Sequence, residues 1–140
     1  MSWTVAELMT PEPRVLAPNT SVMNAAHAMR MADVGTVLVM EGEELHGILT
    51  DRDIVVRAIA AGRDPLTTPV GEVCSRVLVT VSPETGVGEA VRLMREHALR
   101  RLPVVEKDGR VTGIVSIGDI AVARDRRSAL GDISAAPANV

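Results

Sequence analysis

The sequence predicts an α/β fold made of two copies of one strand–helix–strand–strand–helix unit, because the chain repeats itself once. Residues 47–54 read GILTDRDI and residues 113–120 read GIVSIGDI. The residues before each copy repeat as well: 5–40 align with 70–105 at an offset of 65 (70 − 5), and the motif itself at an offset of 66 (113 − 47). A long period that occurs only twice is typical of two packed supersecondary units, whereas a solenoid needs about three repeats or more.

The first repeat provides its elements in order. A short strand is expected over residues 14–16, and the helix that follows carries apolar residues at the spacing of one helical face: Val22, Ala25, Ala26 and Met29. Residues 37–40 are a continuous apolar run, as in a strand covered on both faces. After a turn, residues 45–49 form the third strand, and the closing helix begins at Thr50.

The second repeat follows the same plan. Its first helix carries Val87, Ala90, Val91 and Met94. Residues 102–105 and 110–115 are the expected strands, joined by a turn that contains Asp108-Gly109, a good hairpin signal. The closing helix begins at Ser116. Thr20 and Thr85 are the expected N-caps of the two earlier helices.

These repeats set the predicted domain boundaries. Residues 1–62 form the first repeat with its N-terminal segment, and residues 70–126 form the second. The linker at 63–69 is rich in turn signals, Asp-Pro and Thr-Pro among them. Residues 127–140 drift into Ala, Pro, Ser and Asn, which predicts a poorly ordered C-terminal tail.

Composition limits the function classes. The chain has 140 residues, 46% of them hydrophobic, and a net charge of −3, with Trp3 as its single aromatic residue. A negative charge and so few stacking side chains argue against a nucleic-acid surface. No apolar run approaches the roughly 18 residues of a membrane-spanning helix, and the N-terminus lacks the pattern of a secretory signal. Cys74 alone cannot form an internal disulfide, which predicts a cytoplasmic protein.

The repeated Thr/Ser-x-x-Asp step is the strongest candidate for chemistry. It occurs as Thr50 and Asp53 in the first repeat and as Ser116 and Asp119 in the second. A strand that ends in a hydroxyl residue and turns into a helix presents backbone N–H groups to an anion such as phosphate. The aspartate can accept hydrogen bonds from the two hydroxyls of a ribose. The same spacing is also that of a helix capping box, and both interpretations can hold at once.

Taken together, these motifs resemble a tandem pair of CBS domains, the arrangement called a Bateman module. The resemblance covers residues 5–125 and is carried by Thr20-Ser21-Val22, Gly35-Thr36-Val37-Leu38-Val39 and Gly47-Ile48-Leu49-Thr50-Asp51-Arg52-Asp53, matched by Thr85, Val87, Ala90, Arg101-Leu102-Pro103-Val104-Val105 and Gly113-Ile114-Val115-Ser116 with Asp119. In size and layout the chain is similar to small bacterial two-CBS proteins of the hypoxic-response-protein type. The resemblance implies βαββα repeats related by a pseudo-twofold axis and packed sheet to sheet.

The family also implies two clefts between the repeats that take AMP, ADP, ATP or a related adenosyl ligand. The preferred cleft would combine Thr20, Ala25, Arg101, Ser116 and Asp119. The other would combine Thr50, Asp53, Thr85 and Ala90. The first is preferred because the counterpart of Arg101 in the other cleft is an uncharged threonine, Thr36, and charge-assisted bonds to phosphate are about twice as strong as neutral ones.

Two functions follow as hypotheses. The first is a regulatory protein that binds an adenine nucleotide between its repeats and signals to a protein partner or a dimer mate by a conformational shift. The alternative is a dimerisation or protein-interaction module with unused clefts. Catalysis is not expected, because no nucleophile, base and orienting group can be named, and neither is a metal site. A homodimer is expected through the closing helices, at residues 54–59 and 120–122.

Overall fold

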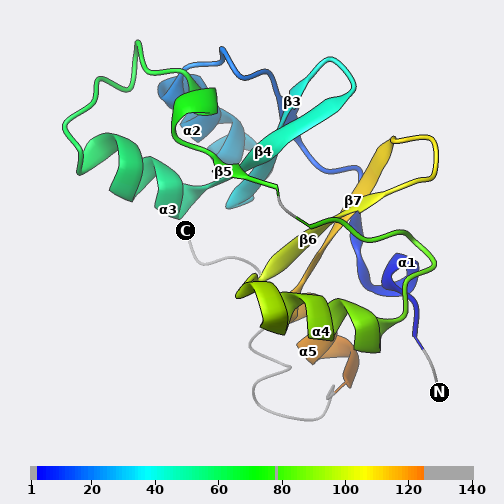
Figure 1. Ribbon diagram of the computed structural model, residues 1–140. Coiled ribbons are helices and arrows are strands. Elements are labelled where there is room, and N and C mark those ends of the chain that lie inside the picture. Colours follow the sequence, from blue (N-terminus) through cyan, green and yellow to red (C-terminus); the bar gives the residue numbers. More distant parts are fainter. Residues whose placement is uncertain (1–2, 78, 125–140) are drawn as a thin grey trace. The chain divides into compact units, whose positions relative to one another are not determined.

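The computed structural model describes residues 3–77 and 79–124, so the predicted tail at 127–140 lies outside the described residues. The α/β class is confirmed (Figure 1). In chain order the elements are α1 (Val5–Leu8), β1 (Thr10–Pro11), β2 (Val15–Leu16), α2 (Val22–Ala32), β3 (Thr36–Glu41), β4 (Glu44–Thr50), α3 (Asp51–Asp53), the π-helix η1 (Ile54–Ile59), the 3-10 helix η2 (Val70–Glu72), β5 (Ser75–Arg76), α4 (Val87–His97), β6 (Arg101–Val105), β7 (Val111–Ser116) and α5 (Ile117–Arg124).

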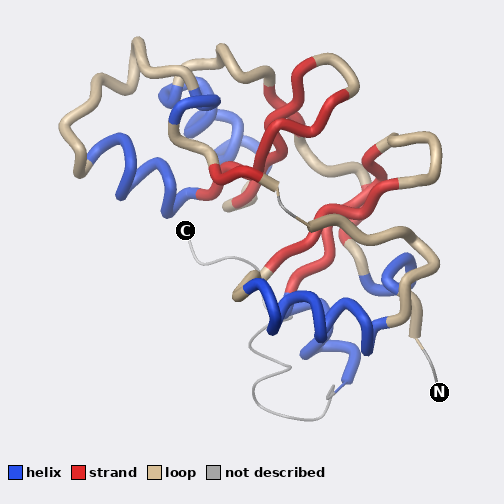
Figure 2. Tube along the Cα trace, in the orientation of Figure 1, coloured by secondary structure: helices blue, strands red, loops and turns tan. Residues whose placement is uncertain are grey.

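These elements form two compact units. The first unit spans residues 14–77, and the second combines residues 3–13 with residues 79–124. The first unit holds a sheet in the order β2-β3-β4-β5, and the second a sheet in the order β1-β7-β6 (Figure 2). Each sheet is centred on an antiparallel hairpin, β3–β4 or β6–β7. In the first unit β2 pairs in parallel with β3. At the corresponding place in the second unit there is one parallel bridge, between Val81 and Val104.

The leading segment of each repeat packs in the other unit. By the sequence repeat, residues 5–13 lead the first copy, yet β1 pairs with β7 of the second unit, with Thr10 opposite Ile114. Residues 70–77 lead the second copy, yet β5 pairs with β4 of the first unit, with Arg76 opposite Gly47. Each compact unit therefore contains the leading segment of one sequence repeat and the body of the other. β1 and β5 each form an edge of a sheet. Each pairs with the strand that carries the glycine of the repeated motif, Gly113 for β1 and Gly47 for β5.

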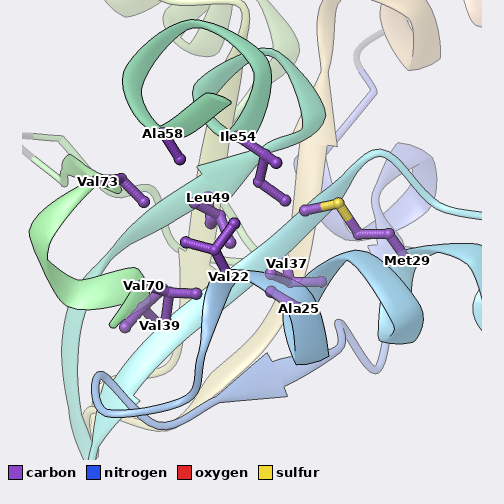
Figure 3. Close-up of a cluster of buried hydrophobic side chains, with 10 residues drawn as sticks. All are labelled: Val22, Ala25, Met29, Val37, Val39, Leu49, Ile54, Ala58, Val70 and Val73. Carbon is purple, nitrogen blue, oxygen red and sulfur yellow. The ribbon is translucent and has the colours of Figure 1, made fainter. Parts of the chain in front are cut away.

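Each unit has its own aliphatic core. In the first unit, side chains from α2, from η1 and from η2 with its C-cap residue meet those of β3 and β4, as Figure 3 shows for Val22, Ala25, Met29, Val37, Val39, Leu49, Ile54, Ala58, Val70 and Val73. The second unit buries Val5, Val81, Val87, Ala90, Met94, Leu102, Val104, Val115 and Ile120. The apolar residues that the sequence assigns to one helical face thus point into a core in both repeats. Burial of such side chains is the main stabilising contribution to each unit.

The expected N-caps of α2 and α4 were wrong by one residue. Ser21, not Thr20, caps α2, because its Oγ accepts the Asn24 N–H at 3.1 Å. The N-cap of α4 is Gly86, which has no side chain to accept a bond. The Thr85 Oγ1 instead accepts the Ser82 N–H at 3.0 Å, within the turn that precedes the helix.

The closing helices differ between the repeats, although the sequence predicts the same helix twice. In the second unit α5 is a regular α-helix. In the first unit, one turn of α-helix passes into the π-helix η1, in which the Ala60 N–H donates to the Val55 carbonyl at 2.8 Å. Three apolar residues of η1, Val55, Val56 and Ile59, are about half exposed, at 58%, 47% and 54%.

Candidate functional site

Both copies of the Thr/Ser-x-x-Asp step are complete capping boxes. In the first unit the Asp53 Oδ2 accepts the Thr50 N–H at 2.9 Å, and the Thr50 Oγ1 accepts the Asp53 N–H at 3.2 Å. In the second unit the Asp119 Oδ2 accepts the Ser116 N–H at 2.8 Å, and the Ser116 Oγ accepts the Asp119 N–H at 3.1 Å. Each aspartate therefore uses one oxygen for the cap, and its other oxygen is open to further partners.

The register of the second hairpin places Arg101 next to this step. Arg101, the first residue of β6, is directly opposite Ser116, the last residue of β7. Opposed residues of an antiparallel pair project from the same face with their Cβ atoms about 4.5–5.5 Å apart. A guanidinium, a hydroxyl and the carboxylate of Asp119 are thus gathered where β7 turns into α5, and all three residues are half-buried. This arrangement can hold an anion and a diol side by side.

The first unit repeats this geometry with other chemistry. Thr36 at the start of β3 is directly opposite Thr50 at the end of β4. A threonine hydroxyl therefore occupies the position that a guanidinium occupies in the second unit. The asymmetry that the sequence predicts at this position is present in the folded chain.

The remaining predicted site residues belong to α2 and α4 or precede these helices by one or two residues. Ala25 and Ala90 are fully buried in the cores of the first and second unit, respectively. The Thr20 carbonyl accepts the Val70 N–H at 2.8 Å, and the Thr85 Oγ1 is held by Ser82. Their contact with a ligand stays a prediction.

Two residues near the first step were missed by sequence reasoning. Arg57 lies one turn beyond Asp53 and forms an ion pair with it, with 3.8 Å between Arg57 Nε and Asp53 Oδ1. Asp51 directly follows Thr50, and its Oδ1 accepts the Arg52 N–H at 2.8 Å. The signal that could have found them is a difference between the copies, because neither charge recurs in the second repeat.

Cys74 lies close to the same ion pair. Partial burial raises the pKa of its thiol, and the negative charge of Asp53 raises it further. The thiol is therefore a weaker nucleophile at neutral pH than a free cysteine. This environment is that of a packed cysteine and not of a reactive one.

The comparisons with known proteins agree on one family. A family model described as "CBS domain" matches residues 5–59 and 70–126. The CBS domain-containing protein YhcV of Bacillus subtilis is 43% identical over 118 residues, which are 84% of this chain and 83% of YhcV. Hypoxic response protein 1 of Mycobacterium tuberculosis is 35% identical over 119 residues, 84% of this chain and 82% of that protein.

Two solved structures show the same fold. The crystal structure of Hypoxic Response Protein I with two coordinated zinc ions matches with a TM-score of 0.74 at 35% identity, over 85% of this chain and 97% of that one. The crystal structure of CBSX2 in complex with AMP matches with a TM-score of 0.72 at 28% identity, over 89% of this chain and 97% of that one.

Within residues 3–77 and 79–124, no group of three or more His, Cys, Asp or Glu residues could hold a metal ion. In that same part of the chain, no helix has the length and apolar character needed to span a bilayer.

Proposed function

The chain belongs to the CBS-domain family, and on that premise we propose that it is a regulatory protein that binds an adenine nucleotide, AMP, ADP or ATP. The proposal rests on one observation: Arg101 lies directly opposite Ser116, and Asp119 follows Ser116 in the first turn of α5. CBS pairs are regulatory modules, and a structural relative was crystallised with AMP.

The three side chains would divide the ligand between them. The Arg101 guanidinium presents several N–H donors and a fixed positive charge to a phosphate. The Ser116 hydroxyl can donate to a phosphate oxygen while its oxygen still accepts the Asp119 N–H. The carboxylate oxygen of Asp119 that the cap leaves open can accept from a ribose hydroxyl.

Signalling would follow from a shift between two conformations. A nucleotide that binds one arrangement of the repeats more tightly raises the population of that arrangement, and a partner protein or a second copy of the chain reads the change. No catalytic step is part of this proposal. A cytoplasmic location belongs to it and agrees with the single, free Cys74.

We expect AMP or ATP to raise the melting temperature of the wild-type protein in proportion to the logarithm of its concentration, because a ligand that binds only the folded state stabilises it. Asp119→Asn is expected to remove most of this shift. Its amide can still accept the Ser116 N–H through its one oxygen, so the cap survives, but no second acceptor is left for the ribose. The measurement is a thermal-shift titration of both proteins, with AMP, ADP, ATP and adenosine.

A non-catalytic interaction module is the second candidate. The two complete capping boxes support it, because they explain Thr50, Asp53, Ser116 and Asp119 without any ligand. Absence of any stabilisation by millimolar nucleotide would favour this function over the sensor. An unchanged affinity in Asp119→Asn would keep the sensor and remove the ribose role of Asp119.

We further propose that the chain forms a homodimer through η1. Of the predicted contact residues, Ile54, Ala58 and Ile120 are buried in the cores, and Ala121 and Val122 are half-buried. Val55 and Ile59 are exposed, together with Val56. These three exposed apolar residues all lie on η1, and a second copy of the chain could bury them in an isologous contact.

The dimer can be tested by sedimentation velocity at micromolar concentration. We expect a species of twice the 14.9 kDa chain mass for the wild type, and a chain-sized species for Val56→Asp, because a buried unpaired carboxylate opposes association. Leu66→Asp is the matched control, since Leu66 is exposed at 67% outside η1. A wild type that sediments only as a single chain contradicts the proposal.

A further inference from the structure

We propose that each chain binds one nucleotide, at the Ser116–Asp119 step. At the Thr50–Asp53 step, side chains of the chain itself already pair with the groups that a nucleotide would need. This inference rests on the proposed function and adds the number of sites and the residues that set it. Three differences between the copies carry it, at aligned positions of the two strand–helix steps. Each difference acts in the same direction.

The first difference concerns the open oxygen of the aspartate. In the first unit, Asp53 Oδ1 faces the Arg57 guanidinium at 3.8 Å, and the Asp53 side chain is only 12% exposed. Arg57 Nη1 also reaches the Val73 and Cys74 carbonyls at 3.5 and 3.4 Å, which ties it across the unit. The residue at the position of Arg57 in the second repeat is Ala123.

Among residues 3–77 and 79–124, the corresponding oxygen of Asp119 has no such competitor. Within the described part of the chain, no cationic group lies within ion-pair distance of Asp119, although Arg101 stands on the neighbouring strand. A ribose hydroxyl would have to compete with a guanidinium at Asp53, whereas at Asp119 it would meet an unpaired acceptor. Hydrogen bonds to charged groups are the stronger ones, so the free carboxylate is the better diol acceptor.

The second difference concerns the first helical turn. In the first unit, Asp51 Oδ1 accepts the Arg52 N–H at 2.8 Å, and its Oδ2 lies 2.9 Å from where a Cβ on Gly35 would be. The Asp51 carboxylate thus uses a backbone donor that an anion would need, and it brings negative charge to that place.

The second unit leaves that donor open. The counterparts of Asp51 and Arg52 are Ile117 and Gly118. The Ile117 N–H donates to the Arg100 carbonyl at 2.9 Å, but among residues 3–77 and 79–124 the Gly118 N–H has no acceptor. A backbone N–H at the start of α5 is thus available to a phosphate oxygen, with no carboxylate beside it.

The third difference is the cation on the neighbouring strand. Arg101 stands opposite Ser116, whereas Thr36 stands opposite Thr50. The second step therefore combines a guanidinium with an N–H and a carboxylate oxygen that have no other partner in the described part of the chain. At the first step, Arg57 is held by Asp53, and Arg52, which lies within the step, has an exposed side chain, so neither matches the place of Arg101 opposite the hydroxyl residue. The phosphate and the ribose are both better satisfied at the second step.

Isothermal titration calorimetry with AMP and with ATP counts the sites. We expect one nucleotide per chain, lost in Asp119→Asn and retained at unchanged affinity in Asp53→Asn, whose amide oxygen can still cap the helix. Two equal sites per chain, or an equal loss in Asp53→Asn, would overturn the inference and leave the proposed function standing. Absence of binding to the wild type would instead refute the proposed function and the inference with it.

A variant that gives the first step the residues of the second tests directly whether these residues prevent binding at the first step. Thr36→Arg, Asp51→Ile and Arg57→Ala together are expected to raise the count from one towards two nucleotides per chain. Adding Asp119→Asn should leave only the new site. Circular dichroism and the melting temperature establish that the variant is folded. If a folded variant still binds one nucleotide, these three positions do not close the first step.

Discussion

Arg101→Gln is expected to lower the affinity for AMP by about tenfold to a hundredfold. A hydrogen bond to a charged group contributes about 1.5–3 kcal/mol, and 1.4 kcal/mol corresponds to a factor of about ten in the dissociation constant. Glutamine retains a polar, flexible side chain on β6 next to Ser116 but carries no charge. Isothermal titration calorimetry at fixed ionic strength measures the change.

Two controls separate the charge of Arg101 from general effects. Arg100→Gln removes the same charge one residue earlier, where the side chain is exposed and only the backbone carbonyl is engaged, by the Ile117 N–H at 2.9 Å. We expect it to leave the affinity for AMP nearly unchanged. Adenosine, which has no phosphate, should bind Arg101→Gln as well as it binds the wild type. Equal losses of AMP and adenosine would mean that Arg101 does not contact the phosphate.

The sequence predicted most elements well because their signals are local. The helical spacing of Val22, Ala25 and Met29 is enough to predict one buried face, and all three lie in the core of the first unit. The apolar runs at β3 and β6 and the Asp-Gly turn were confirmed for the same reason. Duplication helped further, since each weak signal occurs twice in the same order.

Features that depend on partners distant in sequence could not be predicted. The pairing of β1 with β7 and of β5 with β4 joins segments of different repeats, and periodicity within one segment says nothing about its partner. The π-helix could not be predicted either, because residues 54–59 have the composition of an ordinary amphipathic α-helix. The caps of α2 and α4 were predicted one residue too early because Thr20-Ser21 and Thr85-Gly86 each offer two acceptable N-cap residues.

The residues of the candidate site that occur in both repeats could be predicted from the sequence. The effect of a residue that occurs in one repeat only could not. Ser116 and Asp119 stand out because Thr50 and Asp53 repeat them, and alignment also singles out Arg101. The closing role of Arg57 depends on a contact one helical turn away and on carbonyls sixteen and seventeen residues further along the chain, so only the folded chain reveals it.

The second prediction concerns Gly47 and Gly113, the glycines that open the two copies of the repeated motif. A Cβ on Gly47 would lie 2.5 Å from the Ser75 carbonyl oxygen and 2.9 Å from the Cys74 Sγ, and a Cβ on Gly113 would lie 2.5 Å from the Met9 Sδ and 2.9 Å from the Thr10 carbonyl oxygen. Real Cβ atoms do not approach other atoms so closely. The glycine that opens each motif is therefore required where the edge strand, β5 or β1, crosses it.

Gly47→Ala is expected to reduce the free energy of unfolding by about 2–3 kcal/mol, near the upper end of the usual range for overpacking. Gly113→Ala should cost less, about 1–2 kcal/mol, because its nearest contact is the flexible end of Met9 and not a backbone carbonyl. Gly88→Ala is the control: nothing lies within 4 Å of a Cβ there, and alanine favours α4 by about 0.5–1 kcal/mol. Urea unfolding gives the three midpoints. If Gly47→Ala unfolds at the same urea concentration as Gly88→Ala, close approach of the edge strand is not the reason for the glycine.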